Sequence, residues 1–222
     1  MDARFFTADN SIMPRLLPLF PLRLVAFPGE AIPLHIFEPR YRQMVGEAEA
    51  SGSEFGIVLA HHGGVVRVGC TVLVESVPQR YEDGTFDVVT RGQRRFEIQS
   101  IDEEKEYLRA EVEYFADEDA TPAEPQLRAD AVRAWALLRE QTGGGGSETP
   151  PDPDDLLLSF RIAAAIGDPE VQSGLLPVRS ETERLRQIVS LVPRFLERKH
   201  YAAKMQKVAA SNGKGHKPGG TG

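Results

Sequence analysis

Five prolines fall within residues 16–42, and their spacing restricts this segment more than any other feature of the chain. Proline has no backbone N–H to donate, so it is disfavoured inside a helix and in the centre of a sheet. The segment must therefore alternate short extended pieces with turns, and Phe27-Pro28-Gly29 is predicted to be one such turn. The five are Pro18, Pro21, Pro28, Pro33 and Pro39.

After the proline-rich segment, the sequence predicts one short helix and then strands. Pro39 occupies a favoured first helical position, and apolar residues at helical spacing continue to Ala50. Strands are predicted over 55–60 and 65–77, joined by a Gly63-Gly64 turn, because β-branched and other apolar residues dominate both runs.

Strand patterns continue to residue 115. Asp83-Gly84 predicts a two-residue hairpin turn between strands over 79–82 and 85–90. A last strand over 107–115 alternates apolar with charged residues. This alternation indicates a sheet that has one face in water.

The second half of the chain changes to helical spacing. Apolar residues from Leu127 to Leu138 form one helical stripe. Asp152-Pro153 is predicted to cap a helix that ends at Gly167, and Asp168-Pro169 to cap another that ends near Leu176.

The last predicted helix opens with a capping box. Ser180 and Glu183 have the spacing of that motif, and an apolar face follows at Leu185, Ile188, Val189 and Val192. Pro193 is expected to bend or briefly break this helix before it resumes over 195–207. Strands followed by helices predict an α+β fold that ends in a small helical bundle.

Composition sets the boundaries of the ordered region. The first 13 residues and the last 17 are expected to be disordered, because neither end shows an apolar period. We therefore expect disordered termini at 1–13 and 206–222, a β subdomain at 14–118, and a helical subdomain at 119–205 that contains a flexible glycine-rich loop at 143–151.

The composition is that of a globular chain, with 41% hydrophobic and 27% charged residues. No apolar run approaches the roughly 18 residues that a membrane span needs. Pro18, Pro21 and Arg23 interrupt the apolar stretch near the N-terminus, so a signal peptide is not predicted. Cys70 is the only cysteine, so an internal disulfide cannot form and a buried, inert thiol is expected. We therefore expect a cytoplasmic protein with no membrane association.

Charge is uneven along the chain, although the net charge of −7 argues against a general nucleic-acid binder. Residues 97–124 hold eleven acids and two bases, whereas residues 179–207 hold eight bases and three acids. Both stretches are interpreted as solvated faces.

Two motifs resemble a known family. The run from Leu16 to Arg42 contains, in order, the Pro-Leu, Phe-Pro-Gly, Pro-Leu, Ile-Phe-Glu and Arg-Tyr elements that open the N-terminal substrate-binding domain of Lon protease. The run from Asp83 to Ile98 is similar to that family's second signature, a hairpin followed by Gly, two residues, Arg and Phe. The resemblance covers about 16–196 and is looser in the helical half. It implies a stand-alone domain of this family, with an antiparallel β pseudo-barrel of the PUA-like kind followed by a helical bundle.

Catalytic motifs of a full Lon protease are absent from these 222 residues. No Gly-x-x-x-x-Gly-Lys-Ser/Thr phosphate loop occurs, and Ser211 with Lys214 lies in a tail that cannot desolvate a lysine base. His61-His62 point to opposite faces of an extended chain, so a metal site is not expected. His35 is interpreted as a structural histidine among apolar neighbours. The sequence predicts a non-enzyme with no catalytic residues, no cofactor and no metal.

The three arginines of the second signature are interpreted as architectural. The resemblance implies that Phe96 lies in the core and that the arginine of the Gly-x-x-Arg-Phe element pairs with a carboxylate such as Glu38. A contact with an anion or RNA is the alternative. The arginines are Arg91, Arg94 and Arg95.

Recognition of unfolded clients requires exposed apolar or strand-edge surface. The candidate peptide-binding residues are Phe20, Phe27, Phe37 and Tyr41, although rings at such spacing also suit a core. The resemblance implies a binding module for unfolded or misfolded segments, acting as an adaptor to a cellular protease or as a holdase. An RNA-binding PUA-like module that uses residues 179–207 is the alternative, a homo-oligomeric scaffold is a third interpretation, and the oligomeric state stays open.

Overall fold

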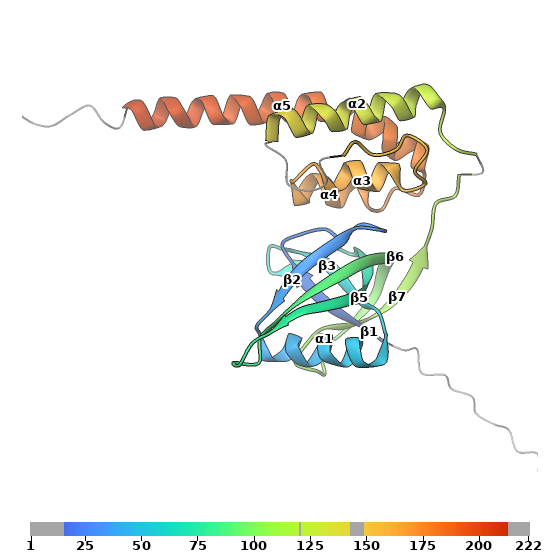
Figure 1. The fold of residues 1–222 in the computed structure, drawn as a ribbon, viewed down its shortest axis with the longest axis vertical. Helices are drawn as coiled ribbons and strands as arrows, with labels where there is room; N and C mark the ends of the chain where they lie inside the picture. The colour runs from blue at the N-terminus through green and yellow to red at the C-terminus, as the bar shows by residue number, and fades with distance from the viewer. Residues whose placement is uncertain (1–15, 120, 143–148, 213–222) are drawn as a thin grey trace, which may run out of the picture.

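A computed structural model describes residues 16–119, 121–142 and 149–212, and within them the chain is a mixed α+β fold of seven strands and five helices. The sheet and the helix beneath it form the lower part of the molecule in Figure 1, and the other helices form a layer above the sheet. The strands are β1 (Leu17–Leu22), β2 (Ala31–Ile36), β3 (Phe55–His61), β4 (Gly64–Val65), β5 (Val68–Arg80), β6 (Phe86–Asp102) and β7 (Arg109–Phe115). The helices are α1 (Pro39–Ser51), α2 (Pro125–Thr142), α3 (Leu158–Ala164), α4 (Pro169–Leu175) and α5 (Glu181–Asn212).

The strands pair in the order β1-β7-β6-β5-β3-β4. All pairings are antiparallel except that of β1 with β3, and this parallel pairing brings the path back to β1. Strand β2 lies off the path and pairs with β6. The α+β class is confirmed, and the pseudo-barrel implied by the resemblance stays a prediction.

The central hairpin forms where the sequence places it, but the predicted two-residue turn is wrong: the Gly84 N–H donates to the Tyr81 carbonyl, and residues 82–84 form a three-residue loop with glycine at its left-handed position. Gly84 has φ +80°, and the Tyr81 N–H donates to the Thr85 carbonyl. The strands on either side are longer than predicted, because each short predicted strand is part of β5 or β6. Strand β6 is long enough to pair with β2 and β5 along its first half and with β5 and β7 along its second.

Helix α1 lies under the sheet (Figure 1) and closes its core. It begins at Pro39 as predicted and ends at Gly52, whose φ of +61° is a left-handed C-cap. Its buried face packs into one apolar cluster with the inner faces of the sheet. The buried residues of α1 are Tyr41, Met44, Val45 and Ala48.

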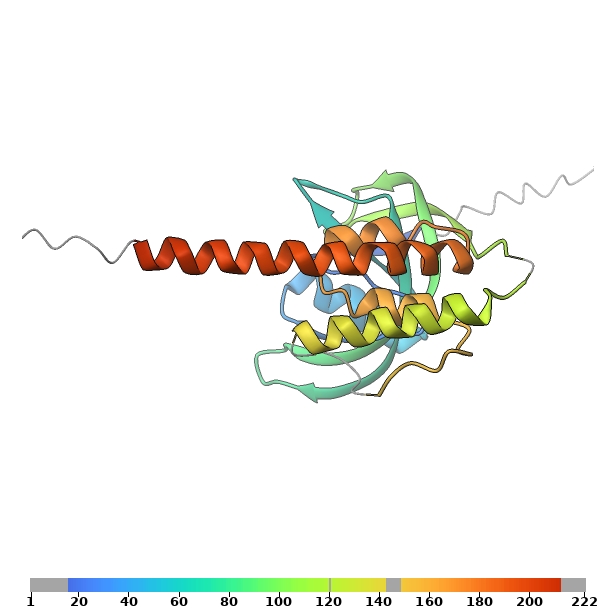
Figure 2. The ribbon, with the colours of Figure 1, turned by 90° about the horizontal axis from the view of Figure 1, so that it is seen from above.

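Helices α2 and α5 run side by side over α3 and α4 (Figure 2). Asp168 caps α4 as predicted, because its side chain accepts from the N–H groups of Glu170 and Val171. The Ser180 hydroxyl likewise accepts from the Glu183 N–H at the start of α5. Helices α4 and α5 therefore begin at the predicted caps. The predicted helical bundle is confirmed only in part.

Two helix predictions are wrong. No helix starts at Asp152-Pro153: α3 begins at Leu158, because Arg128 donates to the carbonyls of Pro153 and Asp155 and holds this segment in turns. Helix α5 also runs through Pro193 without the predicted break, and the alternative of a bend stays a prediction. Buried residues on both sides of the proline anchor α5 to α2 and α3, which offsets the hydrogen bond that proline cannot donate.

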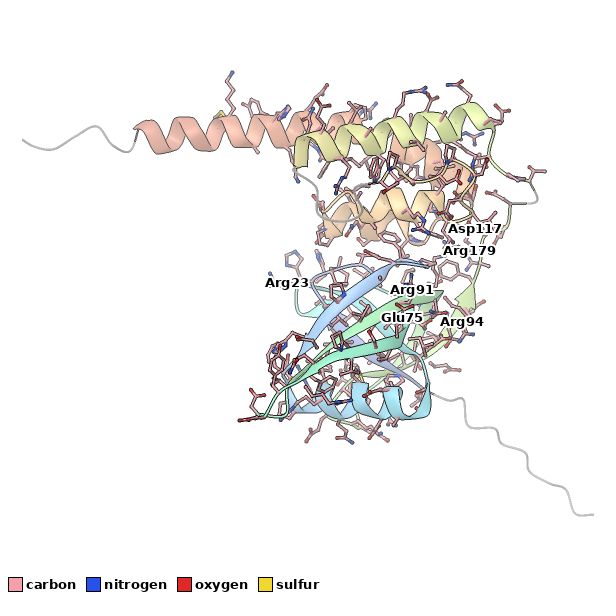
Figure 3. All side chains as sticks on the ribbon, in the orientation of Figure 1. Arg23, Glu75, Arg91, Arg94, Asp117 and Arg179 are labelled. Carbon is pink, nitrogen blue, oxygen red and sulfur yellow. The ribbon has the colours of Figure 1, made fainter. Side chains whose placement is uncertain are left out.

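The second-signature arginines are paired, but not with Glu38. Arg91 pairs with Glu75, Arg94 with Glu54 and Arg95 with Asp117. Figure 3 shows Glu75, Arg91 and Arg94 on the sheet and Asp117 above it, toward the helical layer. Glu38 pairs with Arg40 instead. The antiparallel register explains the error, because Phe86 lies beside Ile36 and the later residues of β6 therefore run away from Glu38. Phe96 is fully buried, as predicted.

Among the described residues, no helix combines the length and the apolar character needed to cross a membrane.

Candidate functional site

Three of the four candidate rings are core residues. Phe20 and Tyr41 pack on each other with ring centroids 4.2 Å apart, and both are nearly inaccessible. Phe27 is completely buried and stacks on Phe160 of α3. These three rings cannot contact a client in this conformation, whereas Phe37 is 61% exposed.

Phe37 belongs to a surface cluster that we call the aromatic patch: His35, Phe37 and Tyr81. The His35 ring lies 6.1 Å from the ring of Phe37 and 5.8 Å from that of Tyr81. His35 is thus on the surface, and its interpretation as a structural histidine among apolar neighbours is wrong: side chains alternate along β2, and His35 falls on the outward series. The patch places exposed apolar surface at the hairpin end of β2.

Asp87 holds the patch together from β6. One carboxylate oxygen lies 2.6 Å from His35 Nδ1, and the other accepts from the Tyr81 hydroxyl at 2.8 Å. These hydrogen bonds lower the pKa of Asp87, and the bond to Asp87 raises the pKa of Tyr81. Asp87 therefore fixes the orientations of His35 and Tyr81, and the His35 ring lies next to both Phe37 and Tyr81.

Strand β2 has a free edge beside this patch. The Gly92 N–H of the β6 strand donates to the Glu30 carbonyl at 2.9 Å, so the even-numbered residues of β2 direct their backbone groups toward β6. The odd-numbered residues direct theirs away from β6, and no other described strand pairs with β2. The groups on this edge are the carbonyls of Ala31, Pro33 and His35 and the N–H groups of Ala31 and His35.

The edge of β5 is protected. Residues 73–80 of β5 extend beyond their partner β3, but register shifts interrupt this part of β5. Helix α1 also lies against it, with Arg80 paired to Glu49 of α1. Bulges and charged covers are the usual protection of a sheet edge. Of the two edges, β2 is the one that an added strand can reach without displacing a helix.

A cleft of about 620 Å³ lies at the opposite end of β2, between the sheet and the helical layer. Its sheet side is formed by the turn of residues 28–31 together with Arg91, and its helical side includes Trp135 and Phe160. Its volume is in the range that small ligands and short peptide segments fill.

Glu30 is the cleft residue with the most unusual environment. Its carboxylate accepts from the Phe27 N–H at 3.0 Å and forms no ion pair with a described cation. Burial raises the pKa of Glu30 to about 7, and the hydrogen bond from Phe27 opposes this shift only partly. The carboxylate is therefore close to half-protonated at neutral pH.

The charged stretches meet at the junction of the two layers. Asp117 and Glu118, from the acidic stretch, pair with Arg184 and Arg179, from the basic stretch. Figure 3 shows Asp117 and Arg179 at this junction. Two arginines of the basic stretch are thus engaged in ion pairs within the chain.

The adjacent histidines do not point to opposite faces as predicted, because His62 takes a left-handed conformation with φ +41° and the rings of His61 and His62 lie 4.0 Å apart. No group of metal-ligating side chains is found among the described residues, and His61 is hydrogen-bonded to Glu170. Cys70 is buried as predicted, and burial raises its thiol pKa to about 12.

Sequence reasoning found Phe37 but missed Tyr81, Glu30 and the free edge. A signal for the edge was present, because residues 31–36 alternate around Pro33, and proline is tolerated in edge strands. No comparable signal marked Glu30, since its burial depends on helices more than 90 residues later in the chain.

Comparison with known proteins gives matches over most of the chain. The model of the ATP-dependent protease La (LON) substrate-binding domain matches residues 16–194. Lon proteases of Flavobacterium johnsoniae and Syntrophus aciditrophicus are each 26% identical to this chain, over 58% and 87% of it. These alignments cover 17% and 27% of the two proteases, so the chain spans at most about a quarter of their length.

Solved structures give the same result. The crystal structure of a Lon N-terminal domain protein from Xanthomonas campestris matches with a TM-score of 0.63 and 26% identity, over 79% of this chain and 97% of that one. The N-terminal domain of the Mycobacterium avium complex Lon protease has the same fold, with a TM-score of 0.56 and 19% identity, over 81% and 98%.

Proposed function

Because the chain belongs to the family of Lon substrate-binding domains, we propose that it binds unfolded or misfolded protein segments by adding them, as an extra strand, to the free edge of β2. The matching family model describes a substrate-binding domain and not the ATPase or protease domains, in keeping with a binding role. The carrying observation is the combination of an unpaired edge with an exposed ring, Phe37, at its end.

Strand addition suits a binder of unrelated clients. Backbone hydrogen bonds to the edge groups of Ala31, Pro33 and His35 do not depend on the client sequence. Apolar contact with the aromatic patch then selects segments that a folded protein would bury. Pro33 lowers the number of donors on the edge, which limits pairing between two copies of the chain.

The resemblance to Lon also bears on what happens to a bound client. We propose that the protein serves in the cytoplasm as an adaptor that delivers clients to a protease, or as a holdase that keeps them soluble. The two roles differ in one measurable way: an adaptor accelerates client degradation when the protease is added, whereas a holdase slows it.

The proposal is tested with a reduced, carboxymethylated protein that cannot fold, labelled for fluorescence anisotropy. Phe37→Ser is expected to weaken its binding about tenfold, because a largely exposed apolar anchor is lost. Tyr201→Ser is the matched control, since Tyr201 is 68% exposed on α5, away from β2, and should leave binding unchanged.

A second variant tests the strand edge itself. Ala31→Pro removes an outward N–H without removing a β2–β6 hydrogen bond, and should weaken binding several-fold. Equal binding by Phe37→Ser, Ala31→Pro and the unchanged protein would show that clients bind elsewhere. Binding that falls steeply with added salt and is competed by RNA would favour the RNA-binding alternative instead.

A further inference from the structure

The free edge and the cleft form one continuous surface. Glu30 directly precedes β2, and the hydrogen bond from the Gly92 N–H to its carbonyl shows that the β2–β6 ladder extends to this residue. A strand added along β2 therefore has one end beside Glu30, at the cleft, and the other end beside the aromatic patch.

Alternation along β2 determines which face each neighbour shares. Ile32, Leu34 and Ile36 point inward and are buried, and Glu30 continues this even-numbered series. A residue of the added strand directly beside Glu30 would point to the same face, with its Cβ about 5 Å from that of Glu30. That residue would enter the cleft.

The chemistry of the cleft favours a cation at this position. Arg91 is engaged by Glu75 and the Gly29 carbonyl, and Arg161 by Asp155. The third guanidinium, that of Arg139, lies over the ring of Trp135. Glu30 has no such partner among the described cations, so its carboxylate carries a desolvation cost that an incoming ammonium or guanidinium would offset.

The opposite end of the edge favours an aromatic or large apolar side chain. His35 belongs to the outward series and carries the exposed Phe37 and Tyr81 rings beside it. A client residue next to His35 lies five positions from the one next to Glu30, about 17 Å along an extended chain. Five is an odd number, so the two client side chains fall on opposite faces, as the cleft and the patch require.

We propose that the preferred client segment carries a lysine or arginine that binds Glu30 in the cleft and, five positions away, an aromatic or large apolar residue that binds the aromatic patch. This inference rests on the proposed function, because it assumes strand addition to β2. It adds a charge requirement and a spacing to a mode of binding that is otherwise independent of client sequence.

Fluorescent ten-residue peptides provide the test, each with one Lys and one Phe in an otherwise Ser/Thr/Val background. The set contains spacings of three, four, five and six, each in both chain directions, and each peptide has a partner with Gln in place of Lys. At a spacing of five, in at least one direction, the Lys peptide is expected to bind about tenfold more tightly than its Gln partner.

The protein variants separate the cleft carboxylate from general electrostatics. Glu30→Gln keeps an acceptor for the Phe27 N–H and is expected to abolish the preference for Lys over Gln. Asp152→Asn removes another carboxylate of the cleft and should leave the preference intact. The peptide comparison on the unchanged protein does not require any variant to fold.

The outcomes distinguish the two proposals. Lys and Gln peptides that bind equally well, with binding still reduced by Phe37→Ser, would overturn the charge requirement and leave strand addition standing. A Lys preference that survives Glu30→Gln would also overturn it. Failure of every peptide and of the unfolded protein to bind would overturn the proposed function itself.

Discussion

Asp117 and Arg184 form a two-point ion pair that ties the end of the sheet to helix α5. Arg184 Nη1 donates to Asp117 Oδ1 at 2.7 Å, and Nη2 donates to Oδ2. The same carboxylate accepts from Arg95 of β6, so one acid bridges the two layers. Burial acts to raise the pKa of Asp117, but the hydrogen bonds and charges of the two arginines outweigh it and hold the pKa below its usual value.

Asp117→Asn should therefore destabilise the protein strongly. Arg184 is fully buried and Arg95 nearly so, and the variant would leave two buried cations without their shared anion. We expect a loss of about 2–3 kcal/mol in the free energy of unfolding, less than for a fully buried pair because Asp117 is partly exposed, and a fall in Tm of about 5–10 °C.

Glu118→Gln is the matched control for Asp117→Asn, because its pair with Arg179 is on the surface. It should change the unfolding free energy by less than about 0.5 kcal/mol. Similar Tm values for the two variants in a calorimetric scan would show that the bridge does not join the layers.

The stability contributed by Glu30 should decrease as pH rises. Its pKa is about 7 in the folded protein, above the ordinary 4.5, so the folded state binds more protons than the unfolded state between these values. The loss between pH 4.5 and pH 7 should reach about 3 kcal/mol. Glu30→Gln removes this dependence. The free energy of unfolding of the variant, measured in urea, should therefore rise relative to that of the unchanged protein over the same pH interval. A constant difference between pH 4 and pH 8 would contradict the raised pKa.

Gly92→Ala should damage the turn that positions Glu30. A Cβ at Gly92 would lie 1.9 Å from the Phe27 carbonyl oxygen, so the backbone of residues 27–29 would have to move. We expect a loss of several kcal/mol and weaker peptide binding. Gly46→Ala, in helix α1 with no atom within 4 Å of the added Cβ, should instead be neutral or stabilising by up to about 1 kcal/mol. Denaturant midpoints of the two variants provide the measurement.

Phe27→Ser and Phe37→Ser should separate the core from the surface. Phe27 is fully enclosed, so its loss leaves a cavity and should cost about 3–5 kcal/mol. Phe37→Ser should lower the free energy of unfolding by less than about 0.5 kcal/mol, because the Phe37 ring is already largely in water. A clear fall in Tm for Phe37→Ser would place that ring in the core instead.

Cys70 should be unreactive in the native protein. The thiol is buried and its pKa is about 12, so almost no thiolate exists at neutral pH. Labelling by a thiol reagent should follow the rate of unfolding and become immediate in denaturant. Rapid labelling in native buffer would indicate that the sheet opens locally around β5.

Local sequence signals predicted local structure well. Pro39 begins α1, Asp83 and Gly84 lie in the hairpin turn, and Asp168 caps α4. Each depends on the conformational preferences of a few neighbouring residues, so the sequence can be interpreted without knowing the fold. The motifs that placed the chain in the Lon family lie in the same first half.

The partners of side chains were predicted less well. Glu38 and the β6 arginines carry opposite charges, but the strand register sends them to different ends of β2. Arg128 likewise prevents a helix at Asp152-Pro153 through contacts across more than 20 residues. In both cases the deciding interaction is non-local.

The sequence by itself determined the family, the α+β class, the position of the hairpin and Phe37 as a candidate contact residue. Only the tertiary structure decided that Phe37 is exposed while Phe20 and Phe27 are buried, that β2 has a free edge, and that Glu30 lies in a cleft. The physical reason is that exposure and pKa depend on which distant segments cover a residue, and strand pairing and helix packing establish that only when the chain has folded.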